Sequence, residues 1–459
     1  MARRLIVIGG DAAGMTAASQ ARRRRGPDEL EIVAFERGHY TSYSACGIPY
    51  WISSVVSDPE QLIARDPETF RRQFHVDVRL RHEVTAIDLD RREVVARDLE
   101  GGGEVRERFD SLMYATGATP IKPDWARTDV RGVFGVQTLD DGAALREWLD
   151  AAPKPRSAVV VGGGYIGVEM AEAILRRGLS VTLIERAEQP MSTVDADMAE
   201  LVSDAMHSLG MQIRTGLSVT GLEERDGRVS AVVTTEEPVP ADVVVLGLGV
   251  RPNVGLAEAA GLPIGPSGAI RTDRRMRVPG VEGVWAAGDC VESLHRVSGM
   301  PVHIPLGTYA NKQGRVAGIN IGGGYATFPG VIGTSVTKVC DLEVGRTGLR
   351  ERDAVASGFE FVSVIAQSTS RAGYFPGSRP MAVKLIAEKP SGRLLGAQIV
   401  GWSEAAKRID ALAVALWNEM TVDDMTALDL GYAPPFSPVW DPVLIAARKA
   451  VDALGASSG

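Results

Sequence analysis

Cysteine is scarce in this chain of 459 residues, and its three copies are widely separated. Cys46 is the only cysteine in the first 289 residues, and Cys290 and Cys340 stand in segments that read as structural. Three cysteines cannot build a disulfide scaffold, so we expect a protein of the reducing cytoplasm. If Cys46 is redox-active, its oxidised form must be a sulfenic acid, or a mixed disulfide or persulfide with a small thiol. A buried, inert cysteine is the alternative.

Histidine clusters and long apolar runs are also missing. The six histidines show no metal-ligand spacing, so we predict no metal. No apolar run approaches the ~20 residues of a membrane span, and the first residues lead directly into strand-like residues 5–8, so we expect no signal peptide. The net charge of −8 disfavours binding to nucleic acid or to an anionic membrane. The composition, with 45% hydrophobic and 24% charged residues, is that of a folded chain long enough for about three domains.

A dinucleotide-binding βαβ unit opens the chain. Residues 5–14 predict a strand and a tight glycine turn, and residues 31–36 predict a second strand that ends in an acid, with a helix between them. Gly9 permits the turn, Gly14 permits close contact between helix and strand, and the start of the helix binds a pyrophosphate. Glu36, 22 residues after Gly14, can hold an adenosine ribose.

One residue of this unit departs from the usual glycine pattern. Asp11 stands where the fingerprint has its middle glycine. A carboxylate beside a pyrophosphate is electrostatically unfavourable. The side chain of Asp11 must therefore point away from the phosphates.

The second βαβ unit is more regular. It carries all three glycines, Gly162, Gly164 and Gly167, followed by a helix and by a strand that ends in Glu185. Glu185 would accept hydrogen bonds from an unmodified ribose and repel a 2′-phosphate, which favours NADH. The adjacent Arg186 could bind such a phosphate, so NADPH is retained as an alternative.

Two such units imply two dinucleotides, FAD in the first and a nicotinamide nucleotide in the second. Residues 112–118 look like the strand and turn that close a flavin domain, with Thr116 and Gly117 in the turn. Residues 283–289 look like the return of the chain to that domain, where Asp289 reaches the ribityl chain of FAD. The flavin domain is then discontinuous, and the nicotinamide domain is inserted into it.

The last part of the chain predicts a mixed α+β domain. Residues 333–348, 359–367 and 381–400 are rich in β-branched and apolar residues, a turn is expected at 390–392, and residues 404–419 are helix-like. We therefore expect an α/β protein with two Rossmann-like dinucleotide-binding domains, for FAD and NAD, and a C-terminal α+β dimerisation domain. The predicted ranges are 1–120 and 250–328 for the two parts of the FAD domain, 121–249 for the NAD(P)H domain and 329–459 for the dimerisation domain.

Residues 42–50, SYSACGIPY, and residues 432–442, YAPPFSPVWDP, complete the pattern. Over essentially the whole chain, it resembles the single-cysteine branch of the pyridine nucleotide-disulfide oxidoreductase superfamily. That branch contains coenzyme A (CoA) disulfide reductases, CoA-dependent persulfide or polysulfide reductases, NADH oxidases and NADH peroxidases. The dithiol members use a C-terminal His-Glu pair, which the absence of histidine after His303 excludes here. The peroxidases and water-forming oxidases carry a histidine in the first glycine turn, where this chain has Ala12.

The resemblance also implies a CoA-binding site and an active site shared by two subunits of a homodimer. Tyr374 and Tyr432 match family tyrosines that reach the active site of the partner subunit, although Phe375 and Ala45 stand where the family often has a second tyrosine and an asparagine. Either tyrosine could instead be an aromatic residue that only packs in an interface. The run of arginines after residue 21 could instead be the solvated end of a helix. The positions that contact CoA in the family fall here on Thr16, Gln20, Arg23, Ser42, Asn311 and Lys312.

The leading hypothesis is a flavin-dependent NAD(P)H oxidoreductase that reduces CoA disulfide, or a CoA or small-thiol persulfide or polysulfide. Tyr165 covers one face of the flavin and moves aside for the nicotinamide, while Glu169 orders that pocket. Cys46 reacts on the other face, beside a helix start that we expect to depress its pKa. Tyr432 or Tyr374 donates a proton to the leaving thiolate. An NADH oxidase that reduces oxygen is the alternative, and a redox-sensing flavoprotein is a third class.

Overall fold

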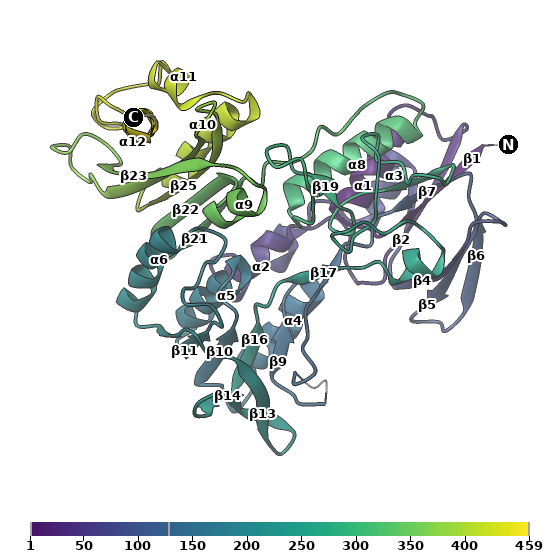
Figure 1. The fold of residues 1–459 in the computed structure, drawn as a ribbon. Helices are drawn as coiled ribbons and strands as arrows, with labels where there is room; N and C mark the ends of the chain where they lie inside the picture. The colour runs from purple at the N-terminus through teal and green to yellow at the C-terminus, as the bar shows by residue number, and fades with distance from the viewer. Residues whose placement is uncertain (1, 127–128, 458–459) are drawn as a thin grey trace.

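The structure of the chain, a computed structural model, describes residues 2–126 and 129–457. Three groups of secondary structure surround the short helix α2 (Ile48–Ile52), which lies near the centre of the view in Figure 1. Two groups contain a five-stranded parallel sheet and the third an antiparallel one, which confirms the predicted α/β class with its C-terminal α+β portion. Residue 1, residues 127–128 and residues 458–459 of the predicted domain ranges lie outside the described residues.

The first group is built on a parallel sheet whose central strands are apolar and almost completely buried. Parallel strands are covered on both faces, so their sequences are continuous apolar runs. Strand β18 pairs with β7 although the whole second group lies between them in the sequence, so the chain leaves this sheet and returns to it. In spatial order the strands are β18 (Val284–Ala286), β7 (Ser111–Tyr114), β1 (Arg3–Ile8), β2 (Leu30–Phe35) and β3 (Val76–Arg79).

Helices α1 (Ala12–Arg22) and α8 (Gly307–Ile321) pack directly against each other beside this sheet (Figure 1). A glycine of α8 makes the close approach possible, because a Cβ atom on Gly314 would lie only 2.3 Å from the carbonyl oxygen of Ala13. A side chain at this position would push the two helices apart. The polar residues of α1 and α8 at the edge of this contact therefore lie next to one another.

The second group repeats the same design. Its five-stranded sheet is also parallel, with α5 (Tyr165–Arg176) following the glycine turn after β10. Strands β8 (Ala118–Pro120) and β17 (Val250–Pro252) pair antiparallel where the chain passes between the first and second groups. In spatial order the strands of the sheet are β12 (Gln212–Arg214), β11 (Ser180–Ile184), β10 (Ser157–Val161), β16 (Val243–Leu246) and β9 (Val133–Gly135).

The third group is a five-stranded antiparallel sheet packed against α10 (Ala405–Trp417) and α12 (Pro442–Ser457). Residues 389–393 connect β24 to β25, so the predicted turn at 390–392 is confirmed. None of the described helices combines the length and the apolar character that crossing a membrane requires. In spatial order the strands are β21 (Ser335–Val339), β22 (Leu342–Gly348), β25 (Leu394–Gly401), β24 (Pro380–Glu388) and β23 (Phe361–Thr369).

The remaining elements are mostly short and cover the three sheets. The helices are η1 (Ala45–Gly47), η2 (Pro59–Leu62), α3 (Pro67–Phe74), α4 (Leu139–Asp150), α6 (Ala196–Ser208), α7 (Gly255–Ala259), α9 (Glu351–Ala356) and α11 (Val422–Thr426). The strands are β4 (His82–Asp88), β5 (Glu93–Asp98), β6 (Glu104–Arg108), β13 (Val219–Arg225), β14 (Arg228–Thr234), β15 (Val239–Pro240), β19 (Ser293–Leu294) and β20 (Pro301–Val302).

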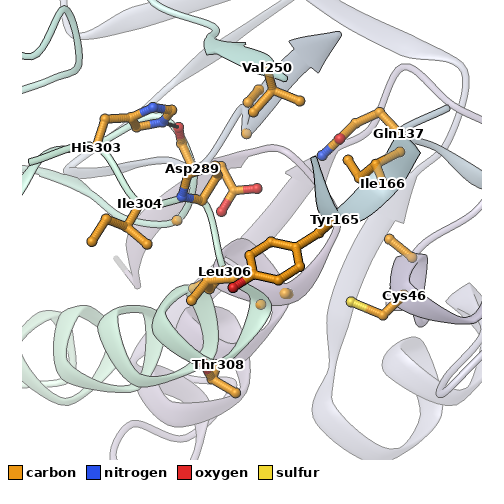
Figure 2. Close-up of a pocket in the computed structure, with 18 of the residues that line it drawn as sticks. Cys46, Gln137, Tyr165, Ile166, Val250, Asp289, His303, Ile304, Leu306 and Thr308 are labelled. Atoms are coloured by element: carbon orange, nitrogen blue, oxygen red, sulfur yellow. Dashed lines mark hydrogen bonds between the residues drawn. The ribbon is translucent and has the colours of Figure 1, made fainter. Parts of the chain in front are cut away.

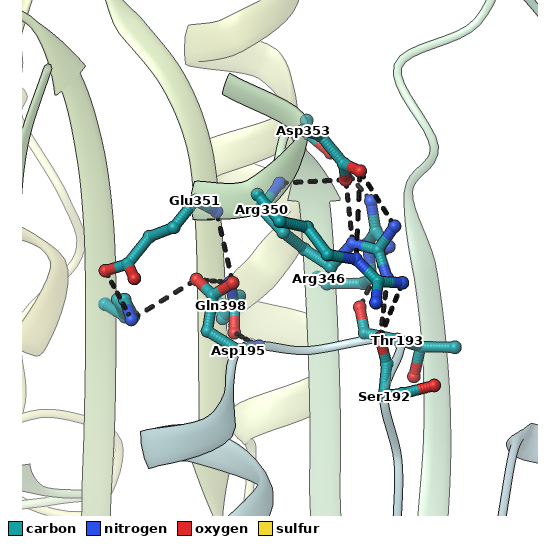
Figure 3. A network of polar contacts seen from close by, with 11 residues as sticks. Ser192, Thr193, Asp195, Arg346, Arg350, Glu351, Asp353 and Gln398 are labelled. Atoms are coloured by element: carbon teal, nitrogen blue, oxygen red, sulfur yellow. Dashed lines mark hydrogen bonds and ion pairs between the residues drawn. The ribbon is translucent and has the colours of Figure 1, made fainter. Parts of the chain in front are cut away.

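Buried polar side chains join the second group to the third sheet (Figure 3). Lys384 on β24 is only 1% exposed, and its ammonium group forms ion pairs with Asp195 at 3.2 Å and Asp197 at 2.7 Å, at the start of α6. A third carboxylate, that of Glu351 on α9, lies 2.8 Å from the same group. Gln398 on β25 also exchanges two hydrogen bonds with Asp195. This network fixes the start of α6 against the third sheet.

We predict that Lys384→Met lowers the free energy of unfolding by about 3 kcal/mol, because it leaves the buried carboxylate of Asp195 without its cation. Urea denaturation followed by circular dichroism measures this loss. Lys407→Met is the control: its exposed ion pair with Asp410 should contribute less than about 1 kcal/mol. Equal effects of the two substitutions would contradict the role of the network.

Candidate active site

A cavity of about 1890 Å³ lies where the three groups meet. Its wall includes Gly9 and Asp289 of the first group, Tyr165 of the second and Thr337 of the third, together with Cys46. Figure 2 shows the ring of Tyr165 reaching across this space and the sulfur atom of Cys46 turned into it. The cavity therefore brings the two predicted dinucleotide units and the lone thiol to one place.

The glycine turns of the two units are held in the same way. One carboxylate oxygen of Glu36 accepts a hydrogen bond from Gly10 N at 2.8 Å, and the other from Gly38 N at 2.7 Å. Glu185 likewise accepts from Gly163 N at 2.7 Å and Ala187 N at 2.8 Å. Each strand-end acid thus ties its glycine turn to the loop that follows the second strand.

The first turns of α1 and α5 have backbone amide groups that could bind phosphate oxygens. Neither Asp11 nor Gly164, the residues that precede these helices, makes a side-chain capping hydrogen bond. The amide groups at a helix start that lack such a partner bind phosphate well. Close packing makes the turns compact, because a Cβ atom on Gly14 would lie 2.0 Å from Gly9 O and one on Gly167 1.9 Å from Gly162 O.

The side chain of Asp11 is directed to the segment that carries the thiol. Its carboxylate accepts a hydrogen bond from Tyr43 N at 3.2 Å. Burial and the nearby carboxylates of Glu36 and Asp289 raise the pKa of Asp11 to about 7. Asp11 therefore links the first glycine turn to the loop before Cys46.

The far end of the first unit offers a second acid to a flavin. Asp289 lines the cavity, and burial raises the pKa of its carboxyl group. The turn at Thr116 and Gly117 is fixed by Asn253, whose backbone oxygen accepts from the Thr116 hydroxyl at 2.9 Å and whose side chain donates to Thr116 O at 2.8 Å. Glu36 for a ribose, the start of α1 for a pyrophosphate and Asp289 for ribityl hydroxyls together fit FAD.

The environment of Cys46 differs from the sequence expectation. Cys46 lies in η1 directly before α2, and its side chain is exposed to the cavity. Burial of this region raises the pKa of the thiol, and the carboxylates of Glu169 and Asp289 raise it further. The expected depression of the pKa is therefore wrong for this chain, because burial and the nearby carboxylates both favour the neutral thiol.

Strand β21 contributes two hydroxyl groups that the sequence did not identify. Tyr165 Oη and Ser335 Oγ share a hydrogen bond of 2.6 Å, and Thr337 Oγ1 donates to Glu169 at 2.6 Å. Burial raises the pKa of Glu169, and the hydrogen bond from Thr337 partly offsets this. The polar residues in the strand-like segment 335–339 were the available signal in the sequence, but they did not indicate which side chains they contact.

The predicted CoA positions lie mainly along α1 and α8. Thr16 donates a hydrogen bond to Asn311 at 2.9 Å across the contact between the two helices. Thr16 and Gln20 share one face of α1 because they are spaced by four, and Arg23 directly follows the last residue of this helix. Ser42 lies beside the first glycine turn, where its backbone nitrogen donates to Gly10 O at 3.1 Å. Arg23, Asn311 and Lys312 are exposed, while Thr16, Gln20 and Ser42 are half-buried.

Within one chain, the structure does not bring the two predicted tyrosines to Cys46. Tyr374 and Tyr432 are exposed on the third group and are not part of the cavity wall. Phe436, Val439 and Trp440 are exposed in the same C-terminal segment as Tyr432.

Two dinucleotide-binding units around one cavity, with a cysteine thiol inside it, define a flavin- and nicotinamide-dependent oxidoreductase. The family described as pyridine nucleotide-disulphide oxidoreductase matches residues 3–314, and the dimerisation domain of that family matches residues 334–442. The chain belongs to this family, whose members use FAD and NAD(P)H.

Relatives with established names cover nearly the whole chain. The NAD(P)H coenzyme A polysulfide/persulfide reductase of Pyrococcus horikoshii is 38% identical, over 98% of each chain. An NADH oxidase of Methanocaldococcus jannaschii is 35% identical over 98% of this chain and 99% of the relative. Among solved structures, a NAD-dependent persulfide reductase from A. fulgidus has a TM-score of 0.95 and 39% identity, over 99% of this chain and 84% of that one.

We predict that Glu169→Gln lowers the pKa of Cys46, because it removes the carboxylate that acts most strongly on the thiol. The rate of Cys46 alkylation by iodoacetamide, measured against pH, should then rise at a lower pH than in the wild type. Glu172→Gln on the same helix is the control, since its carboxylate is not among the groups that shift the Cys46 pKa. An unchanged profile in Glu169→Gln would contradict this account of the site.

Proposed function

We propose that this chain reduces a CoA persulfide, a CoA polysulfide or CoA disulfide with electrons from NAD(P)H, through Cys46. The observation that carries the proposal is the position of Cys46, whose thiol opens into a cavity between two dinucleotide subsites. The other cysteines do not compete for this role. Cys290 is completely buried, and Cys340 lies in the turn between β21 and β22.

The comparisons support a sulfur substrate. A relative of 38% identity and a solved structure of 39% identity are both named as persulfide reductases. The polar face of Thr16, Gln20 and Arg23 next to Asn311 and Lys312 offers hydrogen bonds and positive charge to the phosphates of CoA. Because Asn311 lines the same cavity as Cys46, a CoA bound along this face can extend its sulfur to the thiol.

The reaction needs two steps at the sulfur of Cys46. In the first, the Cys46 thiolate attacks the CoA sulfur of a persulfide, which forms a Cys46–CoA disulfide and releases hydrosulfide. CoA disulfide would react in the same way and release one CoA thiolate. In the second step, two electrons and one proton cleave the mixed disulfide, which releases CoA thiol and restores the Cys46 thiolate. FAD, when bound, supplies the transfer of these electrons from NAD(P)H to sulfur.

The protein's own groups set the protonation of this thiol. The raised pKa of Cys46 means that the thiolate fraction, and with it the first step, increases as the pH rises towards that pKa. A phenol with an ordinary pKa near ~10 can donate a proton to the leaving thiolate. We assign this donor to Tyr432 or Tyr374 of a second subunit, because both are exposed and the matched dimerisation domain supports a homodimer.

The coenzyme is NADH in this proposal, with NADPH as the alternative. Glu185 stands at the end of β11, where a ribose would lie, and its carboxylate repels a 2′-phosphate. Arg186 beside it is the group that would bind such a phosphate. The three free cysteines fit a reducing cytoplasm.

An NADH oxidase is the second candidate, supported by the relative from M. jannaschii that carries this name. Oxygen reduction shares both cofactors but needs no CoA. We predict that NADH consumption by the wild type is rapid without oxygen when CoA persulfide is present, and slow in air when no sulfur acceptor is added. The reverse result would identify the oxidase.

We predict that Cys46→Ser abolishes the NADH-dependent reduction of CoA persulfide and CoA disulfide, because serine cannot form the mixed disulfide. The protein should retain bound FAD, measured by its visible absorbance. Cys340→Ser is the matched control and should keep wild-type turnover. Full turnover by Cys46→Ser would overturn the proposed function.

The mixed disulfide can also be detected directly. We predict that wild-type protein treated with CoA disulfide gains the mass of one CoA thiol per chain, which a reductant removes. Intact-protein mass spectrometry under denaturing conditions measures this adduct. Cys46→Ser should show no adduct, whereas an adduct of the same size on that variant would place the reactive thiol elsewhere.

A further inference from the structure

Strand β21 of the third group is fastened to the helix that opens the nicotinamide unit. Ser335 contacts Tyr165, Thr337 donates to Glu169, and Cys340 N donates to Glu172 at 2.7 Å. Residues 165, 169 and 172 share one face of α5 because their spacing is four and three. Residues 335 and 337 share one face of β21 because strand side chains alternate. One face of α5 therefore lies against one face of β21, and successive residues on the two faces contact each other.

Of these contacts, only the hydrogen bond with Ser335 holds Tyr165, the side chain that we expect to move aside for the nicotinamide. The Tyr165 ring projects into the cavity, and its hydroxyl group shares a hydrogen bond of 2.6 Å with Ser335 Oγ, which also lines the cavity. Thr337 instead holds Glu169, one helical turn further on. Two neighbouring hydroxyls of one strand thus have separate partners, so their contributions can be separated by substitution.

Both ends of the Ser335–Tyr165 contact are fixed to rigid backbone. Tyr165 follows the turn at Gly162. This turn is tightly packed, because Gly167 lies so close to Gly162 O that a side chain at 167 would not fit. Ser335 pairs directly across the sheet with Arg346 on β22. The ring can therefore leave its position by rotation of the side chain and loss of this hydrogen bond, without movement of either element.

Arg346 strengthens the fixed end of this contact. Its guanidinium group donates to Thr193 O at 2.8 Å, in the loop before α6, and to Gly348 O at 2.7 Å (Figure 3). Arg350 also donates to Ser192 O in this loop, so two arginines hold β22, and Ser335 beside it, against the nicotinamide unit.

We propose that Ser335 is a positioning residue that holds Tyr165 across the cavity and sets how readily the nicotinamide ring enters. This inference rests on the proposed function, in which NAD(P)H binds where Tyr165 now lies. A nucleotide that displaces the ring must break the hydrogen bond to Ser335. Its apparent dissociation constant is then the intrinsic one divided by the fraction of molecules in which the ring is already displaced, so a firmer hold on the ring weakens binding.

The test is a double-mutant cycle on NAD⁺ binding to the FAD-loaded protein, measured by isothermal titration calorimetry. Ser335→Ala and Tyr165→Phe each remove the hydrogen bond, so each should tighten binding by about 2- to 12-fold, the range that corresponds to one net hydrogen bond. The double variant should bind no more tightly than either single variant, because both changes remove the same contact. Ser335→Thr, which retains the hydroxyl, should restore the wild-type affinity.

Thr426→Val is the control, since its hydroxyl donates to Asp423 O at 2.8 Å in the third group and Thr426 is not part of the cavity wall. Its affinity for NAD⁺ should stay within about twofold of the wild type. An unchanged or weakened affinity in Ser335→Ala, additive effects in the double variant, or an equal effect of Thr426→Val would overturn the proposal. No sulfur acceptor is present in these titrations, so a failure of the proposed reaction at Cys46 would not alter their result.

Discussion

The attachment of the nicotinamide unit to the antiparallel sheet is the interaction on which the site depends. Lys384 with its three carboxylates, and Arg346 and Arg350 with the carbonyl groups of the loop before α6, make this attachment. A buried cation is costly unless every neighbouring charge is compensated, so such a contact admits few alternative arrangements. It fixes β21 relative to α5, and with it the side chains of Tyr165 and Glu169 that face the thiol.

The same attachment explains the electrostatic character of the cavity. Glu169 of α5, and Asp289 and Asp11 of the first unit, all act on Cys46 with negative charge, in addition to burial. Negative charge around a thiol disfavours the thiolate, so this chain alone does not activate Cys46. Positive and hydrogen-bonding groups instead gather along α1 and α8, where the phosphates of the proposed substrate would bind. Negative charge thus surrounds Cys46, where sulfur would react, and positive charge lies along α1 and α8, where the phosphates of CoA would bind.

Sequence reasoning located the features that depend on local backbone constraints. Gly9, Gly14, Gly162 and Gly167 could be assigned because each allows a close approach that a Cβ atom would block. The return of the chain to the first sheet, seen in the pairing of β7 with β18, was predicted from two short motifs, residues 112–118 and 283–289, that stand on either side of the second glycine turn.

Features set by tertiary contacts could not be predicted in this way. Ser335 lies far from Tyr165 in the sequence, and a lone serine in a strand names no partner. The pKa of Cys46 was predicted in the wrong direction because the neighbouring helix start is visible in the sequence, whereas the approach of Glu169 is not.

Glu36 and Glu185 have one further consequence. Each carboxylate accepts two backbone hydrogen bonds, one from its glycine turn and one from the loop after the second strand. A carboxylate has about four lone-pair positions, so each acid keeps acceptor capacity for a ribose. Both turns are therefore preorganised, and a dinucleotide that binds pays little conformational entropy to order them. The affinity of each subsite then depends mainly on the contacts that its dinucleotide makes, because the hydrogen bonds to Glu36 and Glu185 fix the shape of the two turns.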